Sequence, residues 1–383
     1  MAAAPDFGCH NIAELRERAR RRLPLGVWEY LERGVEDEAG MARNRAAFER
    51  VTFRPRVLRD VSTIDPSTEL LGKKVPFPLA VGPTGAAGIM AYRGDFALAK
   101  AATRAGVPFT ISSASTMDLE QICEAGGRLW FQLYFWQDRD LSLGVVDRAA
   151  ALCDTLMITL DLPVIPNREY LQRNGFGTPF RLNATNTLDV LRHPGWALGV
   201  MGRYALSGGI PSQANLPDRL RNKVTQSALP GALFKQDDLV WDDVARLRER
   251  WPGKLVLKGI LRAEDAEQAA KLGCDGVIVS NHGGRSLDSS CASIDALPDV
   301  VAAVGSKLTV LLDSGVRRGS DIVKAVALGA HGVLAGRAML YGLAAGGEDG
   351  VIRAIDLLRD ETVRTMGMLG ARNICEVDKS LLG

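Results

Sequence analysis

Short apolar runs alternate with alanine-rich stretches of helical period through most of the chain. Runs of this length, set between helical stretches, are typical of buried parallel strands. Eight such runs can be delimited: 77–81, 109–112, 129–133, 156–160, 255–257, 277–280, 308–312 and 333–335. Helical period marks the stretches 96–105, 141–152, 263–272 and 321–328. Gly106, Gly273 and Gly329 follow three of these stretches, as glycine commonly does where a helix ends.

This repetition of strand, helix and glycine predicts an α/β fold, a (β/α)8 TIM barrel. Residues 1–70 form an N-terminal extension of helices with a short extended piece, and residues 166–240 form a long insert after strand 4. The barrel itself takes residues 71–165 and 241–366, so that 1–383 is expected to be a single domain. An insert of that length in a compact domain is usually functional or disordered.

A doubly wound sheet is the alternative fold. It would need a glycine-rich dinucleotide fingerprint after an early strand. The nearest match, Gly175-Phe176-Gly177, carries Phe180 where the third glycine should stand, and no P-loop is present. The sequence therefore favours the barrel.

Composition limits the partners and the compartment. With 47 Lys and Arg against 45 Asp and Glu, the net charge of +2 creates no global field for nucleic acid. The six cysteines form no CxxC pair and no histidine stands at metal-ligand spacing, which favours a reduced cytosolic setting and no metal. The N-terminus resembles no secretory signal and no apolar run is long enough to span a bilayer, so we expect a cytoplasmic protein.

Polar residues follow the predicted strands where a barrel core would normally have Val, Ile or Leu. In chain order they are Pro83-Thr84-Gly85, Ser112, Gln132 with Tyr134, Thr159 with Asp161, Lys258, Ser280 with His282, Asp313 and Gly336-Arg337. All would meet at the carboxyl ends of the strands, where the active sites of such barrels lie. Burying each of them unpaired would cost about 1–3 kcal/mol. The sequence thus predicts a polar ligand there, such as a planar heterocycle with a phosphate tail.

The loops after the last two predicted strands supply a phosphate site. Gly315, Arg317, Gly336 and Arg337 combine flexible backbone amides with guanidinium groups, which suit a dianion at the usual phosphate site of this fold. The alternative for Arg317 and Arg337 is an exposed, salt-bridging arginine. For Arg318 we expect that alternative.

The segment Ser280-Asn281-His282-Gly283-Gly284-Arg285 places an imidazole and a guanidinium three residues apart. Imidazole can accept a proton near neutral pH, and guanidinium can grip a carboxylate through two hydrogen bonds. The paired glycines allow the backbone to turn sharply beside a ligand. The alternative is an ordinary polar surface loop.

Taken with the segments 130–134 (WFQLY), 313–329 and Lys258-Gly259, this motif resembles the FMN-dependent L-2-hydroxy-acid dehydrogenase and oxidase family. The resemblance runs from about Leu23 to the C-terminus, and it is strongest toward the membrane-associated (S)-mandelate dehydrogenases through the segments 82–85 and 193–196. Two departures are Ser286, where Gln is common, and Trp28, where Tyr is common.

The resemblance implies a role for each site residue. His282 would be the catalytic base and Asp161 would pair with its imidazolium. Arg285 and Arg168 would clamp the substrate carboxylate with help from Tyr30, while Tyr134 would bond the hydroxyl end. For Arg168 the resemblance is the main support. Lys258 would stand against N1 and the C2 carbonyl of the flavin. The ring would be held by Pro83, Thr84, Gly85, Ser112, Gln132 and Thr159, with Ser280 nearby, and the phosphate by Asp313, Gly315, Arg317, Gly336 and Arg337.

The implied reaction is oxidation of an L-2-hydroxy acid to the 2-oxo acid with reduction of FMN, with mandelate-like acids ahead of lactate. Whether the α-hydrogen leaves as a proton or as hydride stays open. By the same resemblance we expect a homo-oligomer, a tetramer. The rival functions are a soluble oxidase that produces hydrogen peroxide, an FMN-dependent isomerase and a noncatalytic flavin-binding protein.

The segment 188–210 of the insert mixes aromatic, apolar and basic residues. Together with Arg181, Arg219, Arg221 and Lys223, opposed by Asp189 and Asp218, it predicts a peripheral contact with the inner face of the cell membrane. A membrane contact would favour a quinone over dioxygen as electron acceptor. The alternative is a lid over the active site.

Overall fold

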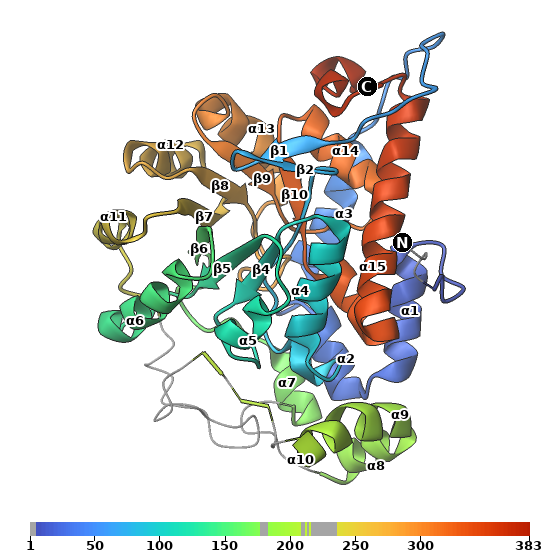
Figure 1. Ribbon diagram of the computed structural model, residues 1–383, viewed down its shortest axis with the longest axis vertical. Helices are drawn as coiled ribbons and strands as arrows, with labels where there is room; N and C mark the ends of the chain where they lie inside the picture. Colours follow the sequence, from blue (N-terminus) through green and yellow to red (C-terminus); the bar gives the residue numbers. More distant parts are fainter. Residues whose placement is uncertain (1–4, 177–182, 208–210, 213, 216–235) are drawn as a thin grey trace.

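Eight parallel strands close into a barrel in the computed structural model, which describes residues 5–176, 183–207, 211–212, 214–215 and 236–383. Around the barrel the order is β10-β3-β4-β5-β6-β7-β8-β9 (Figure 1). The strands are β3 (Leu79–Val81), β4 (Phe109–Ser112), β5 (Leu129–Leu133), β6 (Thr155–Thr159), β7 (Lys254–Ile260), β8 (Gly276–Val279), β9 (Thr309–Leu312) and β10 (Gly332–Ala335). Each coincides with one predicted apolar run, so the predicted barrel is confirmed.

Helices cover the outside of the barrel. They are α4 (Gly94–Ala105), α5 (Leu119–Cys123), α6 (Arg139–Ala150), α11 (Trp241–Arg250), α12 (Ala263–Lys271), α13 (Ser293–Val304), α14 (Gly319–Ala327) and α15 (Arg337–Met368). The four predicted helical stretches correspond to α4, α6, α12 and α14. Helix α15 is interrupted by non-helical backbone at Gly346 and Gly347. Short helical turns occur at Ala87–Ile89, Ile374–Glu376 and Lys379–Leu381.

The N-terminal extension packs on two different sides of the barrel. Helices α1 (Ile12–Arg22), α2 (Leu25–Glu32) and α3 (Ala39–Arg50) are followed by an antiparallel hairpin of β1 (Thr68–Leu70) and β2 (Lys73–Val75). The hairpin closes the amino end of the barrel, where Leu70 and Leu71 are buried with the interior residues. A Cβ on Gly332, the first residue of β10, would lie 2.9 Å from Leu70 Cδ2, so the hairpin needs that glycine.

Side chains inside the barrel change from apolar to polar along the strands β5 to β9. The interior cluster consists of Ala80, Trp130, Met157, Val256, Ile278, Leu311 and Leu334, together with the hairpin residues. Side chains alternate along a strand, so the residue two positions later also points inward. Those residues are Gly82, Gln132, Thr159, Lys258, Ser280, Asp313 and Gly336. The period of two thus places polar groups at the carboxyl mouth, above an apolar plug.

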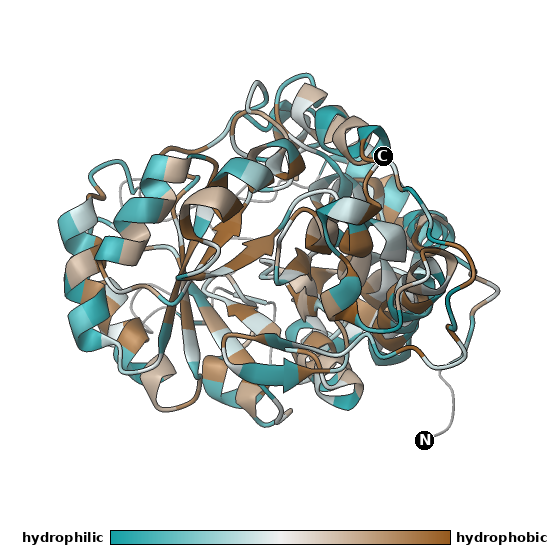
Figure 2. Ribbon diagram, turned by 90° about the horizontal axis from the view of Figure 1, so that it is seen from above, coloured by the Kyte–Doolittle hydropathy of each residue, from teal (hydrophilic) through white to brown (hydrophobic). Residues whose placement is uncertain are grey.

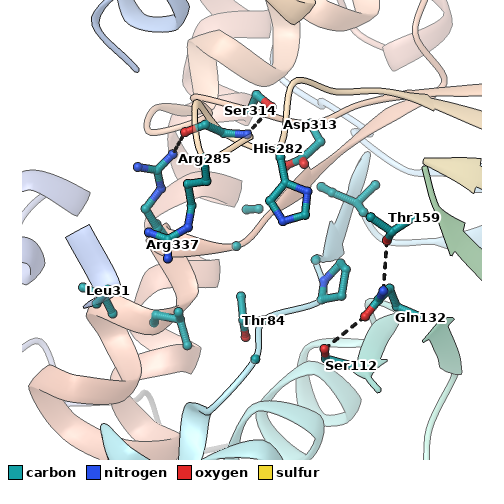
Figure 3. Close-up of a pocket in the computed structure, with 18 of the residues that line it drawn as sticks. Leu31, Thr84, Ser112, Gln132, Thr159, His282, Arg285, Asp313, Ser314 and Arg337 are labelled. Carbon is teal, nitrogen blue, oxygen red and sulfur yellow. Dashed lines mark hydrogen bonds between the residues drawn. The ribbon is translucent and has the colours of Figure 1, made fainter. Parts of the chain in front are cut away.

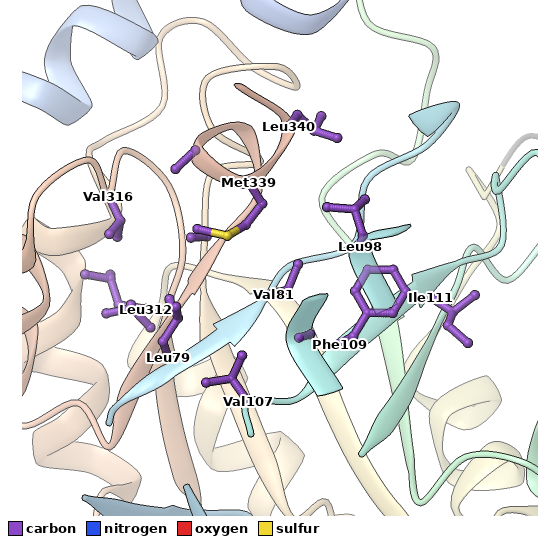
Figure 4. Close-up of a cluster of buried hydrophobic side chains, with 14 of the residues drawn as sticks. Leu79, Val81, Leu98, Val107, Phe109, Ile111, Leu312, Val316, Met339 and Leu340 are labelled. Atoms are coloured by element: carbon purple, nitrogen blue, oxygen red, sulfur yellow. The ribbon is translucent and has the colours of Figure 1, made fainter. Parts of the chain in front are cut away.

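The outward faces of the strands pack against the helices. Figure 4 shows Val81 and Phe109 near Leu98 of α4 and Met339 of α15. Burial of side chains of this size stabilises a fold by about 1.5–3 kcal/mol each. Figure 2, seen from above, shows the hydrophobic residues concentrated on the strands and the helix surfaces that face them. This core holds the strand ends in fixed positions around the mouth.

Part of the insert is described. It contains α7 (Glu169–Asn174), α8 (Ala184–Arg192), α9 (Pro194–Trp196), a π-helical turn η2 (Ala197–Gly202) and α10 (Arg203–Ser207). Asp189 Oδ2 accepts a hydrogen bond from Leu25 N at 2.6 Å, and Trp196 Nε1 donates to Ile89 O at 2.8 Å, so that α8 and α9 are held against the rest of the molecule. Among the described residues, none of the helices combines the length and apolarity needed to cross a bilayer.

Some positions used in the sequence predictions lie outside the described residues. They are Gly177 and Phe180 of the rejected dinucleotide fingerprint, residues 208–210 of the predicted membrane segment, and the charged residues Arg181, Asp218, Arg219, Arg221 and Lys223.

Candidate active site

A cavity of about 290 Å³ opens at the carboxyl ends of the strands. Its lining includes every predicted site residue except Asp161 and Ser280, which contact the lining residues His282 and Lys258. The lining residues predicted from the sequence are Tyr30, Pro83, Thr84, Gly85, Ser112, Gln132, Tyr134, Thr159, Arg168, Lys258, His282, Arg285, Asp313, Gly315, Arg317, Gly336 and Arg337. Figure 3 shows Arg285 and Arg337 at one side of the cavity and Ser112, Gln132 and Thr159 at the other.

The buried lysine at the end of β7 lies among compensating acids. Lys258 Nζ is 3.2 Å from Asp313 Oδ2 and 3.9 Å from Asp161 Oδ2, and it donates a hydrogen bond to Ser280 Oγ at 3.0 Å. Ser280 Oγ in turn donates to Asp313 Oδ2 at 2.9 Å. Burial lowers the pKa of Lys258, but the charges of Asp161 and Asp313 outweigh it and raise the pKa overall. The lysine therefore stays cationic without a ligand.

His282 has its ring oriented by a carboxylate. Its Nδ1 lies 2.8 Å from Asp161 Oδ1, so Nδ1–H donates to the carboxylate and Nε2 is left to accept a proton. Burial lowers the pKa of His282, an effect that Asp161 partly offsets and Lys258 reinforces. Burial raises the pKa of Asp161, but the positive charges around it lower the pKa overall. A neutral imidazole beside an ionised carboxylate is the state that a general base requires.

The backbone at His282 adopts an uncommon conformation. Its φ of 57° is left-handed, and the two residues that follow are Gly283 and Gly284 with φ of 67° and 72°. Ser280 Oγ accepts a hydrogen bond from His282 N at 3.0 Å, which helps to hold this turn. Ser280 is thus placed to position the lysine, the aspartate and the histidine backbone, and it lies next to the lining residues without lining the cavity itself.

Gly259 is a site residue whose role the sequence analysis did not identify. Its φ of 104° occurs where the register between β7 and β8 shifts. A Cβ at this position would lie only 2.7 Å from Asp161 Cβ. The absent side chain allows Asp161 to approach both Lys258 and His282. A lone glycine after a strand does not reveal from the sequence that its φ is positive.

Three polar side chains form a hydrogen-bonded row across neighbouring strands. Ser112 Oγ donates to Gln132 Oε1 at 3.0 Å, and Gln132 Nε2 donates to Thr159 Oγ1 at 3.0 Å (Figure 3). The row fixes the direction of the Gln132 amide. It presents a flat, polar edge that can hydrogen-bond a planar ring.

Four arginines face the cavity without a carboxylate partner among the described residues: Arg168, Arg285, Arg317 and Arg337. Arg285 donates to Arg33 O and Arg337 to Gly283 O, both backbone carbonyls. Burial lowers the pKa of Arg285, and the nearby charge of Arg168 lowers it further. Burial likewise lowers the pKa of Arg337 to about 10, with Arg317 adding to the effect. Arg285 with Arg168, and Arg337 with Arg317, each bring two positive charges together, which favours the binding of an anion.

Two tyrosines, Tyr30 and Tyr134, line the cavity together with Arg285 and Arg168. The Arg285 guanidinium lies 5.6 Å from the centre of the Tyr30 ring. Burial raises the pKa of Tyr134 to about 12, so its hydroxyl remains protonated and can donate a hydrogen bond. Both side chains therefore stand where a carboxylate and its neighbouring hydroxyl could be bound together.

A serine next to Asp313 was also missed. Ser314 Oγ accepts hydrogen bonds from Gly283 N at 2.9 Å and Asn281 N at 3.3 Å, which ties the His282 loop to the loop after β9. Its place between Asp313 and Gly315 could have drawn attention to it.

Arg318 is paired with Glu361 at 3.1 Å, as the sequence predicted for an exposed, salt-bridging arginine.

Comparisons with known proteins agree with this geometry. A family model described as FMN-dependent dehydrogenase matches residues 19–383. The chain is 41% identical over 374 residues to (S)-mandelate dehydrogenase of Pseudomonas putida, covering 97% of this chain and 93% of that protein. It is 40% identical over 376 residues to L-lactate dehydrogenase of Caulobacter vibrioides, covering 97% of each. A crystal structure of the monotopic membrane protein (S)-mandelate dehydrogenase superposes with a TM-score of 0.93 at 41% identity, covering 98% of this chain and 99% of that one.

Proposed function

Because the chain belongs to the FMN-dependent dehydrogenase family and is an FMN-dependent 2-hydroxy-acid oxidoreductase, we propose that it oxidises an L-2-hydroxy acid with an aromatic, mandelate-like side chain, with lactate as the next candidate. One observation carries this proposal. The His282–Asp161 pair stands beside two arginines, Arg285 and Arg168, that lack a carboxylate partner among the described residues. A base next to two guanidinium groups that can bind a carboxylate suits a 2-hydroxy acid.

The residues around the cavity suit FMN. The row Ser112, Gln132 and Thr159, the backbone of Pro83 to Gly85, and Lys258 would hold the ring. Arg317 and Arg337, with the Gly315 and Gly336 backbone, would hold the phosphate, whose charge would relieve the repulsion between the two guanidiniums. When bound, FMN supplies the two-electron acceptor that oxidation of a hydroxy acid needs.

Different side chains bind the substrate, accept its proton and stabilise the charges that develop. Arg285 and Arg168 bind its carboxylate with Tyr30, which fixes the hydroxyl-bearing carbon near His282. His282 Nε2 takes the proton, and Asp161 stabilises the imidazolium that forms. Tyr134 donates a hydrogen bond to the hydroxyl end of the substrate. Lys258 provides positive charge at the ring, where negative charge develops. Proton-first and hydride routes use this same set of residues.

The preference for an aromatic acid rests on the small residues Gly85 and Ala114, which line the cavity together with Tyr30. Larger side chains at these two positions would reduce the space that a substrate could occupy. A bulky side chain on the substrate gains from such space, whereas the methyl group of lactate does not use it.

For the electron acceptor we propose a membrane quinone, reached by peripheral binding at the inner face of the cell membrane. Helices α8 to α10 expose Leu188, Leu191, Leu198 and Leu206, which supports the membrane contact over a lid. The family resemblance further leads us to propose a homotetramer.

An anaerobic substrate screen tests the proposal. Purified protein is mixed with L-mandelate, L-lactate, glycolate or longer hydroxy acids while the flavin absorbance is followed. We expect the fastest bleaching with L-mandelate, whereas no bleaching by any 2-hydroxy acid would refute the function. Under air, peroxide formed per turnover is then compared with turnover on a quinone analogue. Stoichiometric peroxide would replace the quinone proposal with an oxidase.

A further inference from the structure

A second, larger cleft lies outside the barrel mouth, between α1 and the insert helices α8 and α9. Its volume is about 800 Å³. Figure 1 shows α8 and α9 grouped below α1 and α2. The basic residues that line it are Arg18, Arg21 and Arg22 of α1 and Arg192 and His193 of the insert. None of these residues belongs to the active-site cavity.

Among the described residues, two acids line the cleft, Glu14 and Glu17, and neither forms an ion pair with the arginines that line it. Glu14 accepts hydrogen bonds from His10 N at 2.7 Å and Asn11 Nδ2 at 2.8 Å. Glu17 forms ion pairs with Arg16 at 2.7 Å and Arg20 at 3.9 Å, and neither of these arginines lines the cleft. Four arginines against these two glutamates leave an excess of positive charge at the cleft.

The arginines of the cleft have no carboxylate partner among the described residues. Arg22 and Arg18 donate only to carbonyls, both reaching Ala345 O at 2.9 and 3.4 Å. Arg21 and Arg192 are exposed and make no hydrogen bond or ion pair within the described part of the chain. Burial, together with the charge of Arg18, lowers the pKa of Arg22. Like charges gathered in this way are stabilised by a bound anion.

Apolar side chains are exposed on the same insert helices. Leu191 of α8, Leu198 of η2 and Leu206 of α10 are 70%, 73% and 91% exposed. Single exposed leucines are ordinary, but three of them on the insert segment that also lines a basic cleft match the composition of a surface that binds at a lipid interface. A nucleic acid or an acidic peptide would use the arginines and leave the leucines in water.

We propose that this cleft binds the phosphate headgroup of an anionic phospholipid, while the leucines of α8 to α10 rest among the neighbouring acyl chains. The proposal deepens the membrane contact proposed above and rests on it. It adds a contribution from α1, which lies far from the insert in sequence. Trp196 lines the cleft and donates to Ile89 O, and the next residue, Met90, lines the active-site cavity. A lipid in the cleft would thus hold the active site close to the bilayer.

Vesicle sedimentation of the full-length, FMN-loaded protein tests the proposal. Vesicles of phosphatidylcholine alone are compared with vesicles containing phosphatidylglycerol, for the wild type and for the double variant Arg21→Gln/Arg192→Gln. Each arginine near an anionic surface accounts for about a fivefold change in partitioning, so we expect a loss of about 25-fold on anionic vesicles and little change on neutral ones. The matched control is Arg20→Gln, which removes a charge from the same helix outside the cleft.

The outcomes separate the headgroup cleft from the broader membrane proposal. A loss of about fivefold for Arg20→Gln, the loss expected for one arginine of the cleft, would overturn the cleft in favour of a diffuse field. Equal binding of the wild type to neutral and anionic vesicles would also overturn it, while the membrane contact would stand. Absence of binding to any vesicle would overturn both. Excess glycerol phosphate should compete only weakly, because it lacks the acyl chains; full release by it would show a site for soluble phosphates instead. All variants should keep anaerobic bleaching by substrate.

Discussion

Around Lys258 in the active-site cavity each buried charge has an opposite charge within 3.9 Å, whereas the four arginines that line the same cavity have no carboxylate partner among the described residues. Both regions are built on strand ends of the same barrel. They differ in how their charges are balanced. Around Lys258 the side chains balance one another's charges, whereas the arginines would be balanced by two bound anions.

This difference separates the chemistry from the binding. His282, Asp161 and Lys258 are oriented by one another, so the imidazole proposed as the base is held in place before a substrate binds. The arginine pairs gain most of their stabilisation when a carboxylate or a phosphate enters. Changes at the first region should therefore affect the rate of the chemical step, and changes at the second should affect affinity.

The largest effect is expected for His282→Gln. Glutamine cannot accept the proton, so the rate of anaerobic flavin bleaching by substrate should fall by about 10⁴-fold, the upper range for loss of a general base. FMN content should be unchanged, because the residue is not among those proposed to hold the phosphate. Stopped-flow absorbance measures the rate. His10→Gln, at an exposed position, is the matched control.

Retention of rapid bleaching in His282→Gln would remove the histidine from the mechanism. Loss of FMN from the variant would instead show that the region around His282 and the region of the arginines are not independent. That result would contradict the separation of chemistry from binding.

A smaller effect, on affinity, is expected for Arg285→Gln. The variant loses charge-assisted hydrogen bonds to the substrate carboxylate, worth about 1.5–3 kcal/mol, so KM should rise by up to about 100-fold. The change in kcat should be much smaller. Steady-state kinetics with an artificial electron acceptor test this, with Arg318→Gln, at the surface ion pair to Glu361, as control. A fall in kcat with unchanged KM would place Arg285 with the chemistry.

Arg337→Gln should weaken FMN binding by about tenfold. Arg317 and the backbone amides of the two loops remain to hold the phosphate, so one lost guanidinium has a limited effect. Fluorescence titration of the apoprotein with FMN measures the dissociation constant. Riboflavin, which has no phosphate, is the control ligand and should bind both proteins alike. An equal loss of riboflavin affinity would show a damaged fold and not a phosphate contact.

The smallest effect is expected from pH in the neutral range. Burial lowers the pKa of His282 from its usual value near 6.5, so the imidazole stays unprotonated at neutral pH and gains a proton only as the pH falls through the lowered value. kcat/KM should therefore be nearly constant between about pH 7 and 8 and should fall tenfold per unit below the folded pKa. An acid limb centred above pH 7 would contradict the neutral base.

The sequence predicted the barrel well because buried parallel strands are short, continuous apolar runs. It also predicted the residues of the mouth, since the period of two that points Met157 inward also points Thr159 inward. The hairpin at residues 68–75 was predicted only as an extended piece. Its strands carry Glu69, Lys73 and Lys74 at exposed positions, and the buried Leu70 and Leu71 form no apolar run.

The partners of the site residues could not be predicted in the same way. That Asp313 compensates Lys258 depends on the registers of β7, β8 and β9, and the role of Ser280 between them depends on the hydrogen bonds it makes to both residues. Gly259 acts through the side chain it lacks, which shows only when Asp161 is placed beside it. Sequence patterns gave the positions of the groups, whereas their mutual distances required the folded chain.

Reconstitution of the apoprotein tests the central claim most directly. FMN is added to the apoprotein until its absorbance shows saturation, and L-mandelate is then added without oxygen. The account predicts one FMN bound per chain, followed by complete bleaching of the flavin and formation of one equivalent of the 2-oxo acid. A protein that binds no FMN, or that binds FMN but is bleached by no 2-hydroxy acid, would contradict it.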